Sequence, residues 1–193
     1  MIDFAERAAD RSRPGLGAAK FFFALACPLS YLASERIERA LGEIEWVPVL
    51  AASVVEEQRS ERAAEAACRL QLPLGDPPMY PMDSRRASRV AVFAAIDGGV
   101  HQYALAISRL VFCGGFALDD DATIAEAAAA AGIDPRAAVA AANESAYDLQ
   151  IDATTSGLHK RGVAGAPAIR IGTSWFDGVD PLLSLSAWSQ PLG

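Results

Sequence analysis

The chain has 193 residues, of which 52% are hydrophobic and 21% are charged, and its net charge is −7. This composition is that of a folded globular protein, because a disordered chain has fewer apolar residues and more charge. The acidic balance excludes functions that need a basic nucleic-acid-binding surface. We therefore expect no nucleic acid as a partner. No apolar segment is long enough to cross a membrane, so we expect no membrane as a partner either.

The first part of the chain predicts a strand–helix–strand unit. Residues 20–26 form a short apolar run that is typical of a buried parallel strand. Pro28 suits the first turn of a helix, and apolar residues then recur at three-and-four spacing until Gly42 ends the pattern. Residues 44–50 predict a second strand, which completes a βαβ unit.

The middle of the chain is predicted to be helical, and strands return near its end. The predicted helices cover residues 55–71, 84–97, 100–113, 121–131, 135–150 and 180–189. A proline-rich linker, Pro73 to Pro81, follows the first of them, and Asp134-Pro135 predicts a capped helix start. Residues 167–171 and 174–177 flank a Gly-Thr pair, which is the composition of a tight hairpin.

Cysteine spacing bears on the redox compartment. The three cysteines, Cys27, Cys68 and Cys113, include no C-x-x-C pair, and an odd number is a poor disulfide framework. Two histidines are too few to complete a zinc site with them, so we expect no metal. A reducing cytoplasm is the expected compartment.

Three other residues are predicted to have no chemical role. Cys113 shares a helical stripe with Tyr103 and Leu110, which predicts a core position for it. His101 and His159 lie in polar segments with no partner at a useful spacing. We therefore assign neither histidine to catalysis.

Cys27 is the main candidate for chemistry. It follows the first predicted strand and immediately precedes Pro28 and a helix. Unpaired backbone N–H groups and the helix dipole stabilise a thiolate at such a position. The alternative is a buried structural cysteine that packs as a small hydrophobic residue.

Residues 21–33 read Phe-Phe-Phe-Ala-Leu-Ala-Cys-Pro-Leu-Ser-Tyr-Leu-Ala. This stretch resembles the active-site segment of the DsbA-like superfamily, in the branch of 2-hydroxychromene-2-carboxylate isomerases and kappa-class glutathione transferases. The resemblance covers about residues 19–189, and it implies a thioredoxin-like α/β fold (βαβ…ββα) with an all-helical insertion. Further matching segments, in the same order, are Trp46–Val49, Pro81–Ser84, Gly162–Pro167 and Trp175–Asp180.

The turn-rich segment Arg13–Gly17 and the proline-rich linker, together with the resemblance, predict a division of the chain. Residues 1–18 form an N-terminal extension, 19–72 and 160–193 form the thioredoxin-like domain, and 73–159 form the inserted helical domain. A homodimer is compatible with the sequence, which does not determine the oligomeric state.

The resemblance further implies that Pro167 is a cis-proline that faces Cys27. Such a turn leaves the backbone N–H and C=O of Ala166 free to pair with an extended thiol peptide, including the cysteinyl part of glutathione. The alternative is a trans-proline at the start of an edge strand. The implied partners are thiol-containing peptides and small thiols, with glutathione or another low-molecular-weight thiol as co-substrate.

Two further positions qualify this resemblance. Ser30 occupies the place of the resolving cysteine of a C-x-x-C pair, so the chain is either monothiol or not redox-active. Ser30 either donates a hydrogen bond to a sulfur atom or is an ordinary first-turn serine. Asp180 matches an acidic residue that can hold the α-amino group of glutathione. However, Pro181 stands where the isomerases usually have arginine, and Asp180 with Pro181 is also a good helix start.

The leading functional prediction is glutathione-linked thiol–disulfide oxidoreduction by Cys27 through a mixed disulfide. The predicted catalytic residues are Cys27 and Ser30. The first alternative is a glutathione-dependent isomerase in which the Cys27 position activates the thiol of bound glutathione. The second is a non-catalytic thioredoxin-like binding module, which the missing second cysteine and the proline after Asp180 both keep open. The predicted thiol-binding residues are Pro28, Ala166, Pro167 and Asp180.

Overall fold

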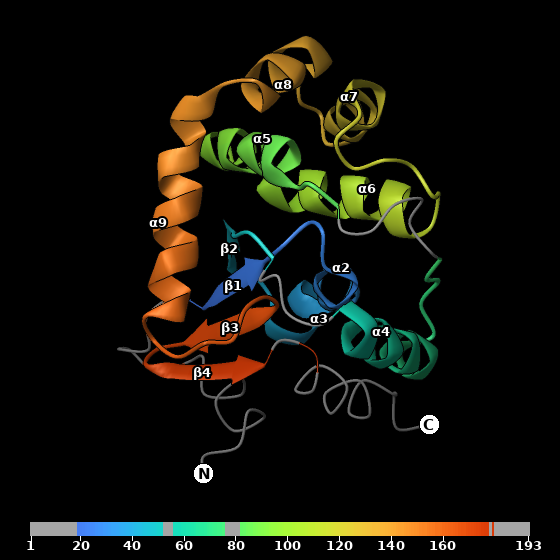
Figure 1. Ribbon diagram of the computed structural model, residues 1–193, viewed down its shortest axis with the longest axis vertical. Coiled ribbons are helices and arrows are strands. Elements are labelled where there is room, and N and C mark those ends of the chain that lie inside the picture. The colour runs from blue at the N-terminus through green and yellow to red at the C-terminus, as the bar shows by residue number, and fades with distance from the viewer. Residues whose placement is uncertain (1–18, 52–55, 76–81, 178, 180–193) are drawn as a thin grey trace.

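The computed structural model describes residues 19–51, 56–75, 82–177 and 179. They form a four-stranded sheet with helices on both sides and a helical block above it (Figure 1). The predicted N-terminal extension (1–18), the predicted C-terminal helix (180–189) and residues 76–81 of the proline-rich linker lie outside the described residues.

The sheet is mixed, and its strand order is β2-β1-β3-β4. β1 is parallel to β2 and antiparallel to β3, and β3 forms a hairpin with β4. The βαβ unit and the hairpin are therefore confirmed. The strands are β1 (Lys20–Phe23), β2 (Glu45–Pro48), β3 (Ala168–Ile171) and β4 (Ser174–Asp177).

The central strand β1 is buried on both faces. Phe21 and Phe23 point to one face and contact the ring of Trp46, with ring centroids 4.9 and 5.5 Å away. Phe22 points to the other face and packs on Trp175 at 5.1 Å. A strand that packs on both faces needs a continuous apolar run, which accounts for the three successive aromatic residues.

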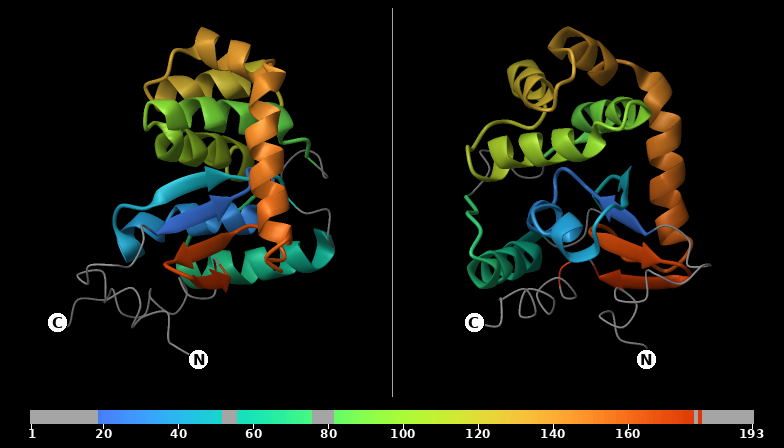
Figure 2. Two further views of the ribbon diagram at one scale, coloured as in Figure 1. Left: turned by 90° about the vertical axis from the view of Figure 1, so that its left-hand side faces the viewer. Right: turned by 180° about the vertical axis from the view of Figure 1, so that it is seen from behind.

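The helices divide into two groups. In Figure 1, α5 to α8 form the block above the sheet, and α9 runs from this block down to β3. α9 passes in front of the strands in the left view of Figure 2, whereas α2, α3 and α4 cover the opposite side. The helices are α2 (Pro28–Ser34), α3 (Ile37–Leu41), α4 (Glu56–Leu70), α5 (Arg85–Ile96), α6 (Val100–Phe112), α7 (Asp121–Ala130), α8 (Pro135–Ala142) and α9 (Asp148–His159).

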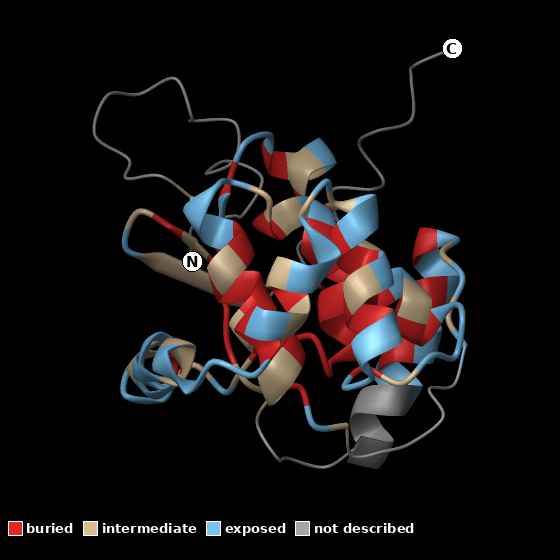
Figure 3. Ribbon diagram, turned by 90° about the horizontal axis from the view of Figure 1, so that it is seen from above, coloured by how far each residue is buried: buried red, intermediate tan, exposed pale blue. Residues whose placement is uncertain are grey.

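The helical block is amphipathic, with its buried residues on the inner faces of the helices (Figure 3). Its alanine-rich helices pack closely, and Ala127, Ala128 and Ala138 are fully buried. The predicted cap of α8 is confirmed: the carboxylate of Asp134 accepts hydrogen bonds from the backbone N–H groups of Arg136 (2.7 Å) and Ala137 (3.2 Å).

Two predicted elements near Cys27 are too long. β1 ends at Phe23 rather than at residue 26, and the chain then turns, with the N–H of Cys27 donating to the carbonyl of Ala24 (3.1 Å). The predicted single helix is divided into α2 and α3. Arg36 departs from helical geometry at φ −124°, and its guanidinium donates to the carbonyl of Leu70 (2.7 Å). The residue that separates α2 from α3 is therefore hydrogen-bonded to α4.

The prediction of one helix over residues 135–150 is wrong. α8 ends at Ala142, where the side-chain amide of Asn143 donates to the carbonyl of Val139 (2.9 Å), and α9 then begins at Asp148. α9 contains Thr154 and Thr155, and threonine has a low helix propensity, so the sequence pattern does not predict this helix. The hydroxyl of Thr155 donates to Ile151 (2.8 Å) and accepts from the N–H of Leu50 (3.1 Å), so α9 also holds the chain just after β2.

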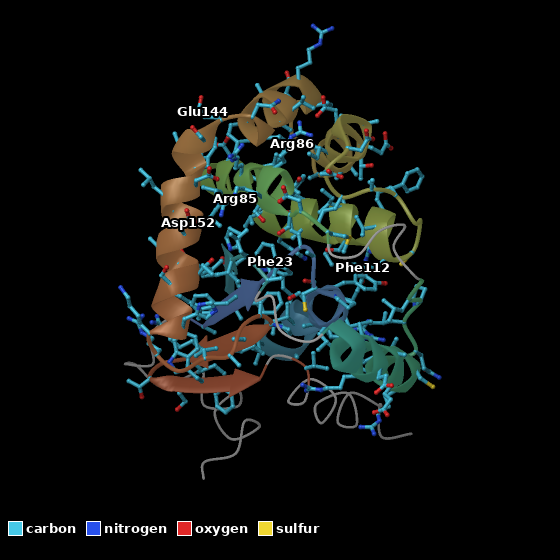
Figure 4. All side chains as sticks on the ribbon, viewed as in Figure 1. Phe23, Arg85, Arg86, Phe112, Glu144 and Asp152 are labelled. Atoms are coloured by element: carbon cyan, nitrogen blue, oxygen red, sulfur yellow. The ribbon has the colours of Figure 1, made fainter. Side chains whose placement is uncertain are left out.

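Arginines on α5 tie the helical block to α9. Arg89 makes a bidentate pair with Asp148, at 2.9 and 2.7 Å. Arg85 donates to Asp152 (3.1 Å), and Figure 4 shows these two side chains approaching each other between α5 and α9. The hydrogen bond from Arg89 holds the pKa of Asp148 below its usual range.

This pKa shift predicts a pH-dependent stability. A carboxyl whose pKa is lower in the folded state stabilises the fold above its unfolded pKa, and the contribution is lost as the pH falls through its folded pKa. We expect Asp148→Asn to lower the urea midpoint at pH 7 and to lower it progressively less below about pH 4.

The control is Asp152→Asn. The side chain of Asp152 is 55% exposed, so its ion pair with Arg85 contributes less to the free energy of unfolding than that of Asp148. A difference between wild type and Asp148→Asn that stays constant from pH 7 to pH 3 would contradict the expectation.

Candidate functional site

Cys27 is the N-cap residue of α2. Its backbone is extended (φ −112°, ψ 115°), and Pro28 occupies the first helical position. Its carbonyl accepts the first hydrogen bond of the helix, from the N–H of Tyr31 (3.1 Å). A proline at this position costs no hydrogen bond, because the first N–H groups of a helix have no partner within it. α2 therefore begins where the sequence predicts.

Ser30 fastens the turn that precedes Cys27. Its hydroxyl accepts a hydrogen bond from the backbone N–H of Ala24 at 3.1 Å, and both residues are buried. A buried N–H without an acceptor is costly, so this bond stabilises the turn between β1 and α2. Neither of the two roles considered from the sequence includes this bond, because the turn was predicted to be strand.

The turn before β3 lies beside Cys27. The Ala166–Pro167 peptide bond is cis, and both residues are buried. The thiol of Cys27 donates to the carbonyl oxygen of Ala166 at 3.6 Å, although the two residues are 139 positions apart. Gly165 has a φ of +153°, which a residue with a side chain rarely adopts. Cys27, Pro28, Ala166 and Pro167 are thus neighbours, whereas Asp180 lies outside the described residues.

The exposure of one of the three cysteines, Cys113, differs from the expectation. Cys27 is only 1% exposed, whereas Cys68 and Cys113 are exposed. The predicted core position of Cys113 is wrong. The buried face of α6 passes through Tyr103, Ile107 and Val111, and Cys113 lies just past the end of the helix, off this stripe.

A contact between α2 and the end of α6 was not predicted from the sequence. The hydroxyl of Tyr31 donates to the carbonyl of Pro73 (3.0 Å) and lies 3.2 Å from the sulfur of Cys113. The ring of Tyr31 stacks on Phe112, which Figure 4 labels, with 5.6 Å between centroids. Burial, with a smaller contribution from the hydrogen bond to Cys113, raises the pKa of Tyr31 well above its usual range.

A second unpredicted cluster surrounds His101. The carboxylate of Glu38 accepts from the indole N–H of Trp46 (3.1 Å) and lies 3.0 Å from Nδ1 of His101. The imidazole stacks on the indole at 4.7 Å. Neither spacing nor periodicity predicts this cluster, because its members come from α3, β2 and α6.

Among the described residues no three His, Cys, Asp or Glu side chains are grouped so that they could hold a metal ion. None of the described helices is both long and apolar enough to span a membrane.

The contact of Ser30 with Ala24 can be tested by substitution. We expect Ser30→Ala to lower the free energy of unfolding by about 1 to 3 kcal/mol, because it leaves the buried N–H of Ala24 without its acceptor. The measurement is urea unfolding.

Ser34→Ala is the matched control. Ser34 is also buried on α2, but no backbone N–H of the described residues donates to its hydroxyl. Equal losses of stability in the two variants would show that the Ser30 bond contributes nothing specific.

The comparisons with known proteins agree with this geometry. The sequence matches the family model of the DSBA-like thioredoxin domain over residues 19–187, and a search of curated proteins finds no match. A solved 2-hydroxychromene-2-carboxylate isomerase is 20% identical, with a TM-score of 0.68 over 88% of this chain and 93% of that one. A probable DsbA oxidoreductase from Streptomyces coelicolor is 18% identical, with a TM-score of 0.66 over 91% and 92% of the two chains.

The cytosolic disulfide reductase DsbM from Pseudomonas aeruginosa is 15% identical, with a TM-score of 0.68 over 88% of this chain and 94% of that one. A structure of that protein with GSH is also similar to this chain. At such identities these likenesses show the fold alone, and they confirm the predicted thioredoxin-like fold with a helical insertion. The family model covers most of the sequence, so the chain belongs to the DsbA-like thioredoxin domain family of thiol–disulfide oxidoreductases and isomerases.

Proposed function

We propose that this protein is a monothiol thiol–disulfide oxidoreductase that acts through Cys27, with glutathione or another low-molecular-weight thiol as co-substrate. The observation that carries the proposal is the thiol of Cys27 at the start of α2, 3.6 Å from the carbonyl oxygen of Ala166. Backbone groups beside a cis-proline can pair with an extended peptide that brings its own sulfur to this thiol.

The chemistry needs one protein thiol and two glutathione sulfurs. The thiolate of Cys27 attacks the glutathionyl sulfur of a mixed disulfide, and the substrate leaves as a thiolate that takes up a proton. Cys27 is then joined to glutathione by a disulfide bond. A second glutathione thiolate attacks the bound glutathionyl sulfur, which releases oxidised glutathione and restores the thiolate of Cys27.

Position 30 supports the monothiol form of this cycle. A dithiol enzyme resolves the mixed disulfide with its second cysteine, but here that place is taken by Ser30, whose hydroxyl is bound to the N–H of Ala24. An external thiol must therefore resolve the intermediate. A reducing compartment such as the cytoplasm would supply it, and we propose that Asp180 holds the α-amino group of glutathione.

The burial of Cys27 favours a second candidate, a glutathione-dependent isomerase. A thiol that is 1% exposed is reached more easily by a small ligand than by a disulfide on a protein surface. In an isomerase, the group at position 27 would donate a hydrogen bond to the thiolate of bound glutathione without itself forming a covalent bond. The third candidate, a binding module, would bind the thiol without either reaction.

Cys27→Ser distinguishes the two reactions. A hydroxyl cannot take part in thiol–disulfide exchange, so the variant should lose all reduction of a glutathionylated peptide. Peptide mapping after incubation with oxidised glutathione should show a glutathionyl group at position 27 of the wild type and none there in the variant, which separates this adduct from any on the exposed Cys68 and Cys113. Cys68→Ser, which removes an exposed thiol from α4, should behave as the wild type.

Ser30→Cys extends the same test. It rebuilds a C-x-x-C pair, so the new thiol should displace the bound glutathione and leave an intramolecular disulfide. Turnover should then no longer require glutathione when dithiothreitol is supplied to reduce that disulfide. If Cys27→Ser instead retains isomerase activity because its hydroxyl still donates a hydrogen bond, the isomerase is correct. Binding of glutathione without either activity in the wild type would favour the binding module.

A further inference from the structure

Cys27 can react only if the structure around it opens. All seven residues of α2 are buried, and the thiol lies beneath the turn that contains Ala166. Reagents reach a buried group through local openings whose free energy is set by the contacts that must separate. The contacts of the first turn of α2 therefore control how Cys27 meets a reagent.

Tyr31 connects this first turn to the rest of the protein. Its N–H donates to the carbonyl of Cys27 (3.1 Å), so its backbone belongs to the same helical turn. Its hydroxyl donates to the carbonyl of Pro73 (3.0 Å), on the segment between α4 and α5. The side chain thus joins the turn that begins at Cys27 to a distant part of the chain.

The acceptor of this bond is itself held in place. The N–H of Gly75 donates to the carbonyl of Phe112 at 2.6 Å, which fixes the segment 73–75 to the end of α6. A Cβ atom at Gly75 would lie 3.2 Å from that oxygen, so glycine permits the close approach. Because Tyr31 also stacks on Phe112, its ring and its hydroxyl are fixed by the same region.

The Tyr31 hydroxyl has two hydrogen-bond partners in this region, Pro73 and Cys113. The carbonyl of Pro73 can only accept, and it accepts from the phenol of Tyr31 (3.0 Å) and from the thiol of Cys113 (3.7 Å). The phenol oxygen and the sulfur of Cys113 lie 3.2 Å apart, and either group can donate across this distance. Burial keeps the pKa of Tyr31 well above its usual range, so the phenol remains a donor throughout the pH range of ordinary assays.

Side-chain hydrogen bonds of Glu35 and Arg36 to neighbouring helices lie past the far end of α2. Glu35, just past its last turn, makes a bidentate pair with Arg109 at 2.6 and 2.7 Å, which ties the end of α2 rather than its first turn to α6. Arg36 bonds to Leu70 beyond the helix. Tyr31 is thus the residue of the first turn whose side chain is hydrogen-bonded to the α6 region.

We propose that the Tyr31 hydroxyl is a positioning group for Cys27, which holds the first turn of α2 in place and limits the openings that expose the thiol. The inference rests on the proposed function only in taking Cys27 as the reacting thiol. Cys113, which lies outside the site, supports Tyr31 through its hydrogen bond.

The experiment measures initial rates of alkylation of Cys27 by iodoacetamide, by peptide mapping at low total labelling. Tyr31→Phe keeps the ring and its stacking on Phe112 but removes the bond to Pro73. We expect the rate at Cys27 to rise roughly three- to tenfold, the range that the loss of one hydrogen bond gives.

Tyr103→Phe is the matched control. Tyr103 is fully buried, and its hydroxyl also donates to a backbone carbonyl, that of Ala87 (3.3 Å), but it links α6 to α5 rather than to α2. We expect the rate at Cys27 to change by less than about twofold, although the unfolding midpoint falls as in Tyr31→Phe.

The Cys113 variants provide a rescue by a conservative substitution. Cys113→Ala removes the hydrogen-bond partner of the Tyr31 phenol and should accelerate the alkylation of Cys27, whereas Cys113→Ser keeps a partner that can donate or accept and should restore the wild-type rate. Because Cys113 is exposed, both variants should fold. They therefore test the proposal even if Tyr31→Phe does not fold.

The proposal is overturned if Tyr31→Phe leaves the rate at Cys27 within twofold of wild type, or if Tyr103→Phe raises it equally. It is also overturned if Cys113→Ala and Cys113→Ser behave alike. Alkylation requires no disulfide exchange. If the wild type forms no adduct with oxidised glutathione at Cys27, the proposed oxidoreductase function is refuted. The comparison of alkylation rates at Cys27 among the variants still holds in that case.

Discussion

The pairing of β1 with β3 is the contact on which the candidate site depends. The two strands are antiparallel, so the turn that follows β1 lies beside the turn that precedes β3. Cys27 and Ala166 occupy these two turns, and their contact at 3.6 Å follows from the strand register. The aromatic side chains of β1, packed on both faces of the sheet, fix its place between β2 and β3.

Much of this arrangement could be predicted from the sequence, because its signals are local. The apolar run before Cys27, Pro28 at a helix start and the Gly-Thr pair of the hairpin each determine a nearby element. The helix α9 was missed because threonines at 154 and 155 weaken its pattern. The division of α2 from α3 was missed for a different reason, since the partner of Arg36 lies on another helix.

The site was predicted less completely than the fold. The resemblance indicated Cys27, Ala166 and Pro167, which the structure brings together. The roles of Ser30 and Tyr31 depend on a turn and on a segment near residue 73, and neither spacing nor periodicity reports such contacts. The exposure of Cys113 likewise depends on where α6 ends, and the ends of helices are poorly determined by sequence.

The placement of the helical block between β2 and β3 has a consequence for biosynthesis. Because β1 and β2 are close in sequence, they can pair early, but β3 is translated only after every helix from α4 to α9. The loop that β3 must close is long, and long-range pairings form late. On the ribosome, Cys27 therefore exists for most of the time of synthesis without the carbonyl of Ala166, and a nascent chain released before β3 contains the thiol but only half of its surroundings.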